Sequence, residues 1–315
     1  MKYLLLTLFI VNINCMSNKC AVPETLSKKA IAELNTVLQN EQKFIKVHAA
    51  EFLLWLDLNQ DDVKNIFLKE NEEFGNEPKY RIGIWRVLAQ ASAGDEKQKW
   101  TEKIMNVFID TSAPDRIHAA ETLAKLKTSP MTRYYDISKR TLADTNSILS
   151  VYTKWATSYT SVDDAALNKK DFINYLFNSD DTTVRKISAY VLAKSKNLTP
   201  QEWEHLADKA LAEPVHSPLK QTYLNTAFVT FTGADDGKAD QIKKELTEGY
   251  LKFNAEQRIS LSQSLADKGG CDDIPILESF LNNENAAAFY DEKSSLAADV
   301  RAFAAYGILN IKKKK

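Results

Sequence analysis

The sequence IKVHAAEFLL, at residues 45–54, returns in degenerate form along the chain. It recurs as DRIHAAETLA at 115–124, as VRKISAYVLA at 184–193 and as VRAFAAYGIL at 300–309. With weaker copies between them, the copies begin at Ile45, Tyr80, Asp115, Ser147, Val184, Leu219, Gln257 and Val300. Successive starts lie from 32 residues apart (115 to 147) to 43 residues apart (257 to 300). A period of this size indicates stacked supersecondary units rather than one globular core.

Each copy has the residue pattern of one amphipathic helix. The fourth and fifth positions after the first are mostly small, as in Ala49 and Ala50, and the eighth is mostly large and apolar, as in Leu53. At 100° per residue these positions share one side of a helix, so neighbouring helices can approach closely there. The position after the first is basic in seven of the eight copies: Lys46, Arg81, Arg116, Arg185, Lys220, Arg258 and Arg301. We expect its head group to reach a carboxylate in a connecting segment, for which the candidates are Asp61, Asp95, Asp180 and Asp181.

Other helix-like segments separate the copies. They cover about residues 26–39, 61–73, 95–109, 131–142, 162–178, 200–211, 235–252 and 272–284. Several of them carry apolar residues at helical spacing, and the prolines of the chain fall at or near the predicted junctions. Each unit is therefore predicted to be a helix–turn–helix, and about eight such units make an all-α chain.

The core pattern V-R-x-x-A-A-x-x-L is clearest in two copies, which run over 184–192 and 300–308. In this pattern the chain resembles HEAT-repeat proteins over about residues 26–315. The resemblance implies a right-handed α-α superhelix, a HEAT-like solenoid of about eight helix pairs, and we expect a monomer. HEAT arrays serve as scaffolds, adaptors, transport factors and, rarely, enzymes, so the resemblance predicts a fold more than a function.

The N-terminus has the features of an export signal. A basic start is followed by an apolar run over residues 3–13, which is too short to span a bilayer. Residues 1–14 resemble a bacterial lipoprotein signal peptide, which implies lipidation of Cys15, a tether over 15–25 and a place in the periplasm or on the outer membrane. Asn12 and Asn14 depart from that pattern, which prefers Leu and a small residue there, and a simple cleaved export signal is the alternative. Cys20 and Cys271 are expected to be free thiols, because one lies in the tether and the other near the far end.

Charge and motifs exclude several classes of function. The chain has 41 basic and 42 acidic residues and a net charge of −1, so it lacks the basic excess with which proteins bind nucleic acid. It contains no phosphate-binding loop, dinucleotide fingerprint or nucleophile elbow. We therefore expect no cofactor and no nucleic-acid partner, and contact with a membrane through a lipid anchor alone.

A candidate groove follows from the face opposite the packed side. The third, sixth and tenth positions of each copy would face the concave surface of a solenoid. In the first three copies the polar and aromatic candidates are His48, Glu51, Trp55, Arg86, Gln90, His118, Glu121 and Lys125. Gly83 is expected to leave a recess between the two histidines, and Trp55 to offer a stacking face.

Two functions fit this groove. The first is an envelope-tethered binding or scaffold module whose concave face binds a protein, peptide or glycan, since similar HEAT segments accompany glycan-degrading systems. The alternative is an enzyme or metalloprotein that uses His48, Glu51, His118 and Glu121. We expect no metal, because a firm site needs three or four ligands with a supporting shell. The plainer interpretation is that the repeated His and Glu descend from one ancestral unit and are merely solvated.

Overall fold

The computed structural model describes residues 22–144, 147–282 and 295–314. This part of the chain is all-helical, contains no strand and forms sixteen α-helices. The first eight are α1 (Glu24–Asn40), α2 (Lys43–Trp55), α3 (Gln60–Phe74), α4 (Tyr80–Gln90), α5 (Gly94–Ile109), α6 (Arg116–Lys125), α7 (Tyr135–Ala143) and α8 (Ile148–Thr157). The second eight are α9 (Val162–Asn178), α10 (Thr182–Ser195), α11 (Pro200–Ala212), α12 (Lys220–Val229), α13 (Asp236–Thr247), α14 (Ala255–Lys268), α15 (Ile274–Leu281) and α16 (Ser295–Lys313).

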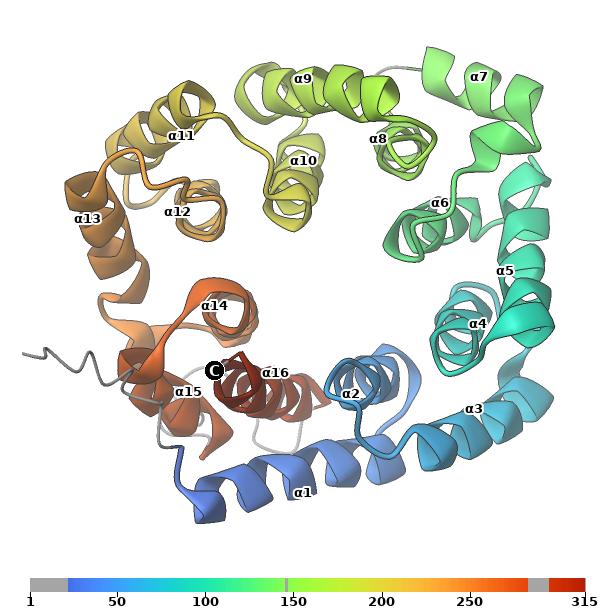
Figure 1. Ribbon diagram of the computed structural model, residues 1–315, viewed down its shortest axis with the longest axis horizontal. Coiled ribbons are helices and arrows are strands. Elements are labelled where there is room, and N and C mark those ends of the chain that lie inside the picture. The colour runs from blue at the N-terminus through green and yellow to red at the C-terminus, as the bar shows by residue number, and fades with distance from the viewer. Residues whose placement is uncertain (1–21, 145–146, 283–294, 315) are drawn as a thin grey trace, which may run out of the picture.

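The helices are arranged in a ring of two layers (Figure 1). Odd-numbered helices form the outer layer, and even-numbered helices surround the centre. All eight copies of the repeat lie on even-numbered helices, and the segments predicted between them are the odd-numbered ones. Short 3₁₀ turns at Pro130–Thr132, Tyr250–Lys252 and Cys271–Asp273 replace one end of three predicted helices. The architecture is compatible with an α-solenoid.

Small residues bring neighbouring inner helices close together. Ala49, Ala50 and Leu53 are completely buried, as the repeat pattern predicts. Gly83 serves the same purpose on α4, since a Cβ there would lie 3.0 Å from a methyl group of Val47 on α2. The expectation of an open recess at Gly83 is therefore wrong, because Val47 of the neighbouring helix occupies the space that a side chain would take.

The basic residue of the repeat ties seven of the eight inner helices to their surroundings. Arg81 donates to the Asp115 carboxylate at 2.7 and 2.9 Å, and Arg116 donates to the backbone carbonyl of Phe108 at 2.7 Å. Other partners are the carboxylates of Glu70 and Glu33 and the carbonyls of Ser179, Ala210, Leu211, Leu251 and Phe253. A cation suits the carbonyls at the end of a preceding helix, where the orphan acceptors carry partial negative charge.

Three of the four aspartates proposed as partners of these cations lie at helix N-termini instead. Asp181 caps α10, where its carboxylate accepts from the Thr183 amide at 2.7 Å. Asp61 and Asp95 lie in the first turns of α3 and α5. Acidic residues in the first turn are stabilised by the positive end of the helix dipole. The basic residues do reach neighbouring segments, but the proposed aspartates are not their partners, which are backbone carbonyls and other carboxylates.

The two ends of the described chain meet and close the ring. Helix α16 packs against α1 and α2 as well as against its sequence neighbours α14 and α15. Arg301 on α16 pairs with Glu33 on α1 at 2.8 Å, and Lys313 pairs with Asp57 at 2.5 Å. We call the contact of α16 with α1 and α2 the seam. Because of the seam, the expected concave face is the inside of a ring.

Cys271 corrects one expectation about the cysteines. It is disulfide-bonded, so the prediction of a free thiol is wrong. Its partner lies outside the described residues, as do the predicted signal peptide, most of the tether and Cys15. Helix α1 begins at Glu24, inside the range predicted for the tether. Within the described residues, no helix is long and apolar enough to cross a membrane.

Candidate functional site

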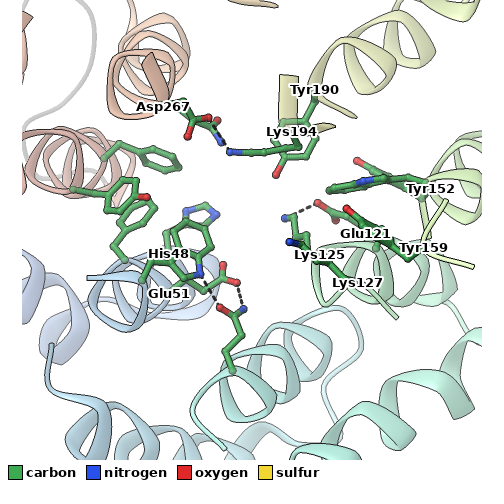
Figure 2. Close-up of a pocket in the computed structure, with 18 residues that line it drawn as sticks. His48, Glu51, Glu121, Lys125, Lys127, Tyr152, Tyr159, Tyr190, Lys194 and Asp267 are labelled. Atoms are coloured by element: carbon green, nitrogen blue, oxygen red, sulfur yellow. Dashed lines mark hydrogen bonds and ion pairs between the residues drawn. The ribbon is translucent and has the colours of Figure 1, made fainter. Parts of the chain in front are cut away.

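A cavity of about 520 Å³ lies on the inner side of the ring. Figure 2 shows labelled side chains from α2, α6, α10 and α14 pointing toward a common space. We call this space the aromatic chamber. It is lined by His48, Glu51, Phe52, Trp55, Gln90, Glu121, Ala124, Lys125, Lys127, Tyr152, Trp155, Tyr159, Tyr190, Lys194, Gln263, Asp267, Phe303 and Tyr306. Its volume lies within the range of roughly 300–1,000 Å³ that is typical of small-molecule sites.

Aromatic rings of the seam form one wall of the aromatic chamber. Phe52 on α2 stacks on Tyr306 of α16 with ring centroids 4.5 Å apart, and its edge contacts Phe303 at 4.8 Å. Trp55 meets Tyr306 at 5.7 Å, and its indole N–H donates to Gln90 Oε1 at 2.8 Å. Trp55 is 45% exposed although it is fixed by these contacts. It therefore presents a rigid aromatic surface to the chamber.

The wall contributed by α8 and α10 is also aromatic. The rings of Trp155 and Tyr190 pack edge to face at 5.7 Å. Burial raises the pKa of Tyr152 and of Tyr159, and the charge of Glu121 adds to the effect at Tyr152. These phenols are therefore protonated at neutral pH, so each keeps an O–H that can donate to a ligand.

Glu51 is ionised and fixed in a buried network. Its carboxylate accepts from Arg86 at 2.7 and 2.9 Å and from Gln90 at 2.7 Å. Burial alone would raise the pKa of Glu51, but the charge and hydrogen bonds of Arg86 outweigh it and hold that pKa below its ordinary value. Arg86 itself is 4% exposed and also donates to the Thr122 hydroxyl at 3.3 Å. It lies behind the wall and orients Glu51.

The other two carboxylates of the chamber are also paired with cations. Lys125 contacts Glu121 at 2.7 Å, and Lys194 contacts Asp267 at 3.1 Å. Burial opposes ionisation of Glu121, but the charge of Lys125 and the polar contacts around it lower its pKa well below the usual range. With Lys127, three lysines face three carboxylates, so the charges on the wall balance. The chamber therefore has many oriented polar groups but no net charge that selects a charged ligand.

His48 forms a dyad across the seam. Its Nδ1 lies 2.9 Å from Oδ1 of Asp299 on α16, and its ring packs edge to face on Phe303 at 5.2 Å. Asp299 is buried, and a buried carboxylate needs hydrogen-bonding partners, of which His48 is one. In the tautomer that donates from Nδ1 to Asp299, Nε2 is free to accept a proton or a hydrogen bond.

The structure brings together six of the eight residues predicted for the groove. They are His48, Glu51, Trp55, Gln90, Glu121 and Lys125. Arg86 lies behind the wall. His118 is not part of the lining. Its ring lies against Phe44, with ring centroids 6.0 Å apart, and its Nδ1 is 3.9 Å from the Glu121 carboxylate. The roles of all eight in binding stay predictions.

Sequence reasoning missed twelve of the eighteen lining residues, although a signal was present for half of these twelve. The rule of third, sixth and tenth positions also has value beyond the first three copies. Applied to the copies that begin at Val184, Gln257 and Val300, it selects nine residues, of which six line the chamber: Tyr190, Lys194, Gln263, Asp267, Phe303 and Tyr306. It fails for the fourth copy, where Tyr152 and Trp155 lie at the fifth and eighth positions after Ser147.

The candidate metal ligands do not gather into one site. Among the residues that the structure describes, no group of three or more His, Cys, Asp and Glu side chains could hold a metal ion. His48 is engaged with Asp299, and Glu51 with Arg86. These residues therefore supply oriented hydrogen-bonding groups rather than a ready set of metal ligands.

No protein-family model matches the chain, and none of the curated proteins or solved structures compared with it matches either. The HEAT resemblance thus rests on the repeated residues themselves. Function has to be inferred from the geometry and chemistry of the aromatic chamber.

Proposed function

We propose that this protein is a binding module whose aromatic chamber holds a neutral, polar ligand built of rings, with a saccharide as the best fit. The observation that carries the proposal is the wall itself. Eight aromatic side chains surround about 520 Å³, and the charged groups between them balance. Of the protein, peptide and glycan ligands expected for a concave face, the glycan suits an aromatic-lined cavity of this size best.

The wall suits both the apolar C–H face and the hydroxyl groups of a sugar ring. Aromatic rings pack well against its apolar C–H face, as Trp55 is placed to do. Its hydroxyls need fixed donors and acceptors, which Gln90, Lys125 and the tyrosines supply. The ion pair with Glu121 holds Lys125, and hydrogen bonds with Trp55 and Glu51 hold Gln90, before binding, which lowers the entropy cost of ordering them.

The same proposal includes the wider architecture and location. We propose HEAT-type repeats in about eight helix pairs, wound as a right-handed superhelix that closes at the seam, in a monomeric protein. We also propose export, with lipidation of Cys15 and attachment to the periplasmic or outer-membrane surface. The disulfide at Cys271 supports export, because disulfides persist in oxidising compartments and are rare in the cytosol.

Calorimetric titration with purified neutral oligosaccharides tests the proposal. Candidate probes are the cello-, xylo-, malto-, manno- and chito-oligosaccharides. The change Trp55→Ala should weaken binding of the best of them about tenfold or more, since it removes an exposed aromatic contact surface. Tyr135→Ala is the matched control, because Tyr135 is an exposed aromatic residue on the outer helix α7. Failure of every saccharide to bind, or equal binding by both variants, would contradict the proposal.

A second candidate function is catalysis on the bound ligand, with His48 as the proton acceptor. The observation that favours it is that His48, on the chamber wall, pairs with the buried carboxylate of Asp299. An imidazole held this way is a typical general base. Glu51 and Glu121 suit a catalytic role less well, because lysine and arginine hold both ionised. Incubation with the bound oligosaccharide should then release products at a rate lost in His48→Gln, and an intact ligand with wild-type protein would rule this out.

A further inference from the structure

A second cavity of about 500 Å³ lies beside the aromatic chamber, next to α12. Four residues line both cavities: Tyr190, Lys194, Gln263 and Asp267. The two are therefore neighbouring chambers of one inner space, and we call the second the polar chamber.

The polar chamber differs in chemistry from the aromatic one. Ten of its nineteen lining residues carry an aliphatic hydroxyl or a carboxamide, among them Gln221, Thr222 and Asn225 of α12. Its aromatic side chain, Tyr190, belongs to the shared boundary. A neutral ligand rich in hydroxyl groups would find partners here without the large stacking surfaces of the first chamber.

An ion pair between two inner helices, α10 and α14, forms the boundary between the chambers. Lys194 on α10 contacts Asp267 on α14 at 3.1 Å, and both side chains are partly exposed. Figure 2 shows this pair at the edge of the aromatic chamber. Lys194 also lies over the ring of Tyr190 at 5.7 Å. A chain that runs from one chamber to the other must pass this pair.

One side chain of the polar chamber lacks a partner. The side-chain nitrogen of Gln221 is buried and makes no hydrogen bond within the described part of the chain. An unsatisfied buried donor is costly, and because Gln221 lines the chamber, a turn of its carboxamide toward a ligand hydroxyl would satisfy it. By contrast, Asn225 is fixed by Ser260 at 2.8 Å and by Ser264 at 2.6 Å, so the wall around Gln221 is already ordered.

We propose that one linear, neutral oligosaccharide occupies both chambers and passes the Lys194–Asp267 pair. Its sugar rings stack in the aromatic chamber, and its hydroxyls bond to Gln221 and its neighbours in the polar chamber. This inference rests on the proposed function and adds to it the length of the ligand. The protein is then selective for a chain rather than for a mono- or disaccharide.

The test is the dependence of affinity on chain length, measured by calorimetry from disaccharide to octasaccharide of the series that binds best. Kd should keep falling beyond the disaccharide. Gln221→Leu should weaken the longer chains roughly tenfold, the effect of one lost hydrogen bond to a buried group, and leave the disaccharide unchanged. Unchanged disaccharide binding also shows that the variant is folded. Gln241→Leu, on the outer helix α13 where Gln241 bonds Glu245, is the matched control.

The outcomes separate the two proposals. If the disaccharide binds and Kd stays flat with length, the two-chamber inference is overturned while the proposed function stands. If longer chains bind more tightly but Gln221→Leu does not reduce that gain, the polar chamber is not where they lie. If no saccharide of any length binds, both proposals fail.

Discussion

Helix α2 contacts its two neighbours in the inner layer in different ways. With α4, which follows it in the chain, it shares the buried pair Glu51–Arg86. With α16, from the other end of the chain, it shares stacked rings, such as Phe52 on Tyr306, and the partly exposed pair His48–Asp299. We call the first contact the internal junction, and the second belongs to the seam.

The two contacts depend on different physical forces. A buried ion pair must be matched in geometry and fully hydrogen-bonded, because desolvation opposes it, so it favours one alignment of α2 on α4. Stacked aromatic rings gain free energy from buried apolar area and tolerate small shifts. We infer that the internal junction fixes how neighbouring repeats align, while the seam supplies the apolar area that closes the ring.

The largest expected effect is at the internal junction. Glu51→Ala leaves Arg86 buried without its counter-charge, so we expect the free energy of unfolding to fall by about 4 kcal/mol. Urea denaturation measures this loss. The double variant Glu51→Met, Arg86→Met should lose much less, because neither buried charge remains. Equal losses in the single and double variants would show that charge matching is not what holds the junction.

A somewhat smaller effect is expected at the seam. Phe303→Ala removes a buried ring between α16 and α2, which should lower the free energy of unfolding by about 3 kcal/mol. Amide hydrogen exchange should quicken most in α1, α2 and α16. The seam joins helices from opposite ends of the chain, so it can open while the other repeats stay packed. Phe172→Ala, at a buried ring of α9, is the control and should not quicken exchange there. The same exchange pattern in both variants would mean that the seam does not open separately.

The difference between these contacts also explains what the sequence could predict. Glu51 and Arg86 stand at the sixth position of consecutive copies, so the repeat itself places them on facing helices. His48 and Asp299 are 251 residues apart, and no repeated residue requires them to meet. Their meeting depends on the angle between successive repeats, which accumulates around the ring from the packing of many side chains. The helices and one side of the chamber were therefore predictable, whereas its closure by Phe303 and Tyr306 was not.

The smallest expected effect is the loss of stability in acid, to which the Glu51–Arg86 pair of the internal junction contributes. The pKa of Glu51 and that of Glu121 are lower than their ordinary values in the folded protein, since Arg86 and Lys125 outweigh burial. A carboxyl group with a lowered pKa stabilises the fold above its unfolded pKa, about 4.3 for Glu, and that stability is lost as the pH falls toward the folded pKa. Between pH 7 and pH 4 the loss should be roughly 0.7 kcal/mol or less for each carboxyl group, because mainly the unfolded chain takes up protons there.

Urea denaturation at a series of pH values separates the two contacts by this response. The double variant Glu51→Met, Arg86→Met has lost one of the two carboxyl groups, so its stability should fall less steeply in acid than that of the wild type. Phe303→Ala keeps both, so its curve should run parallel to the wild-type curve at lower stability. Parallel curves for all three proteins would mean that the pairing of Glu51 with Arg86 does not lower the Glu51 pKa. The internal junction would then be held, like the seam, mainly by buried apolar area.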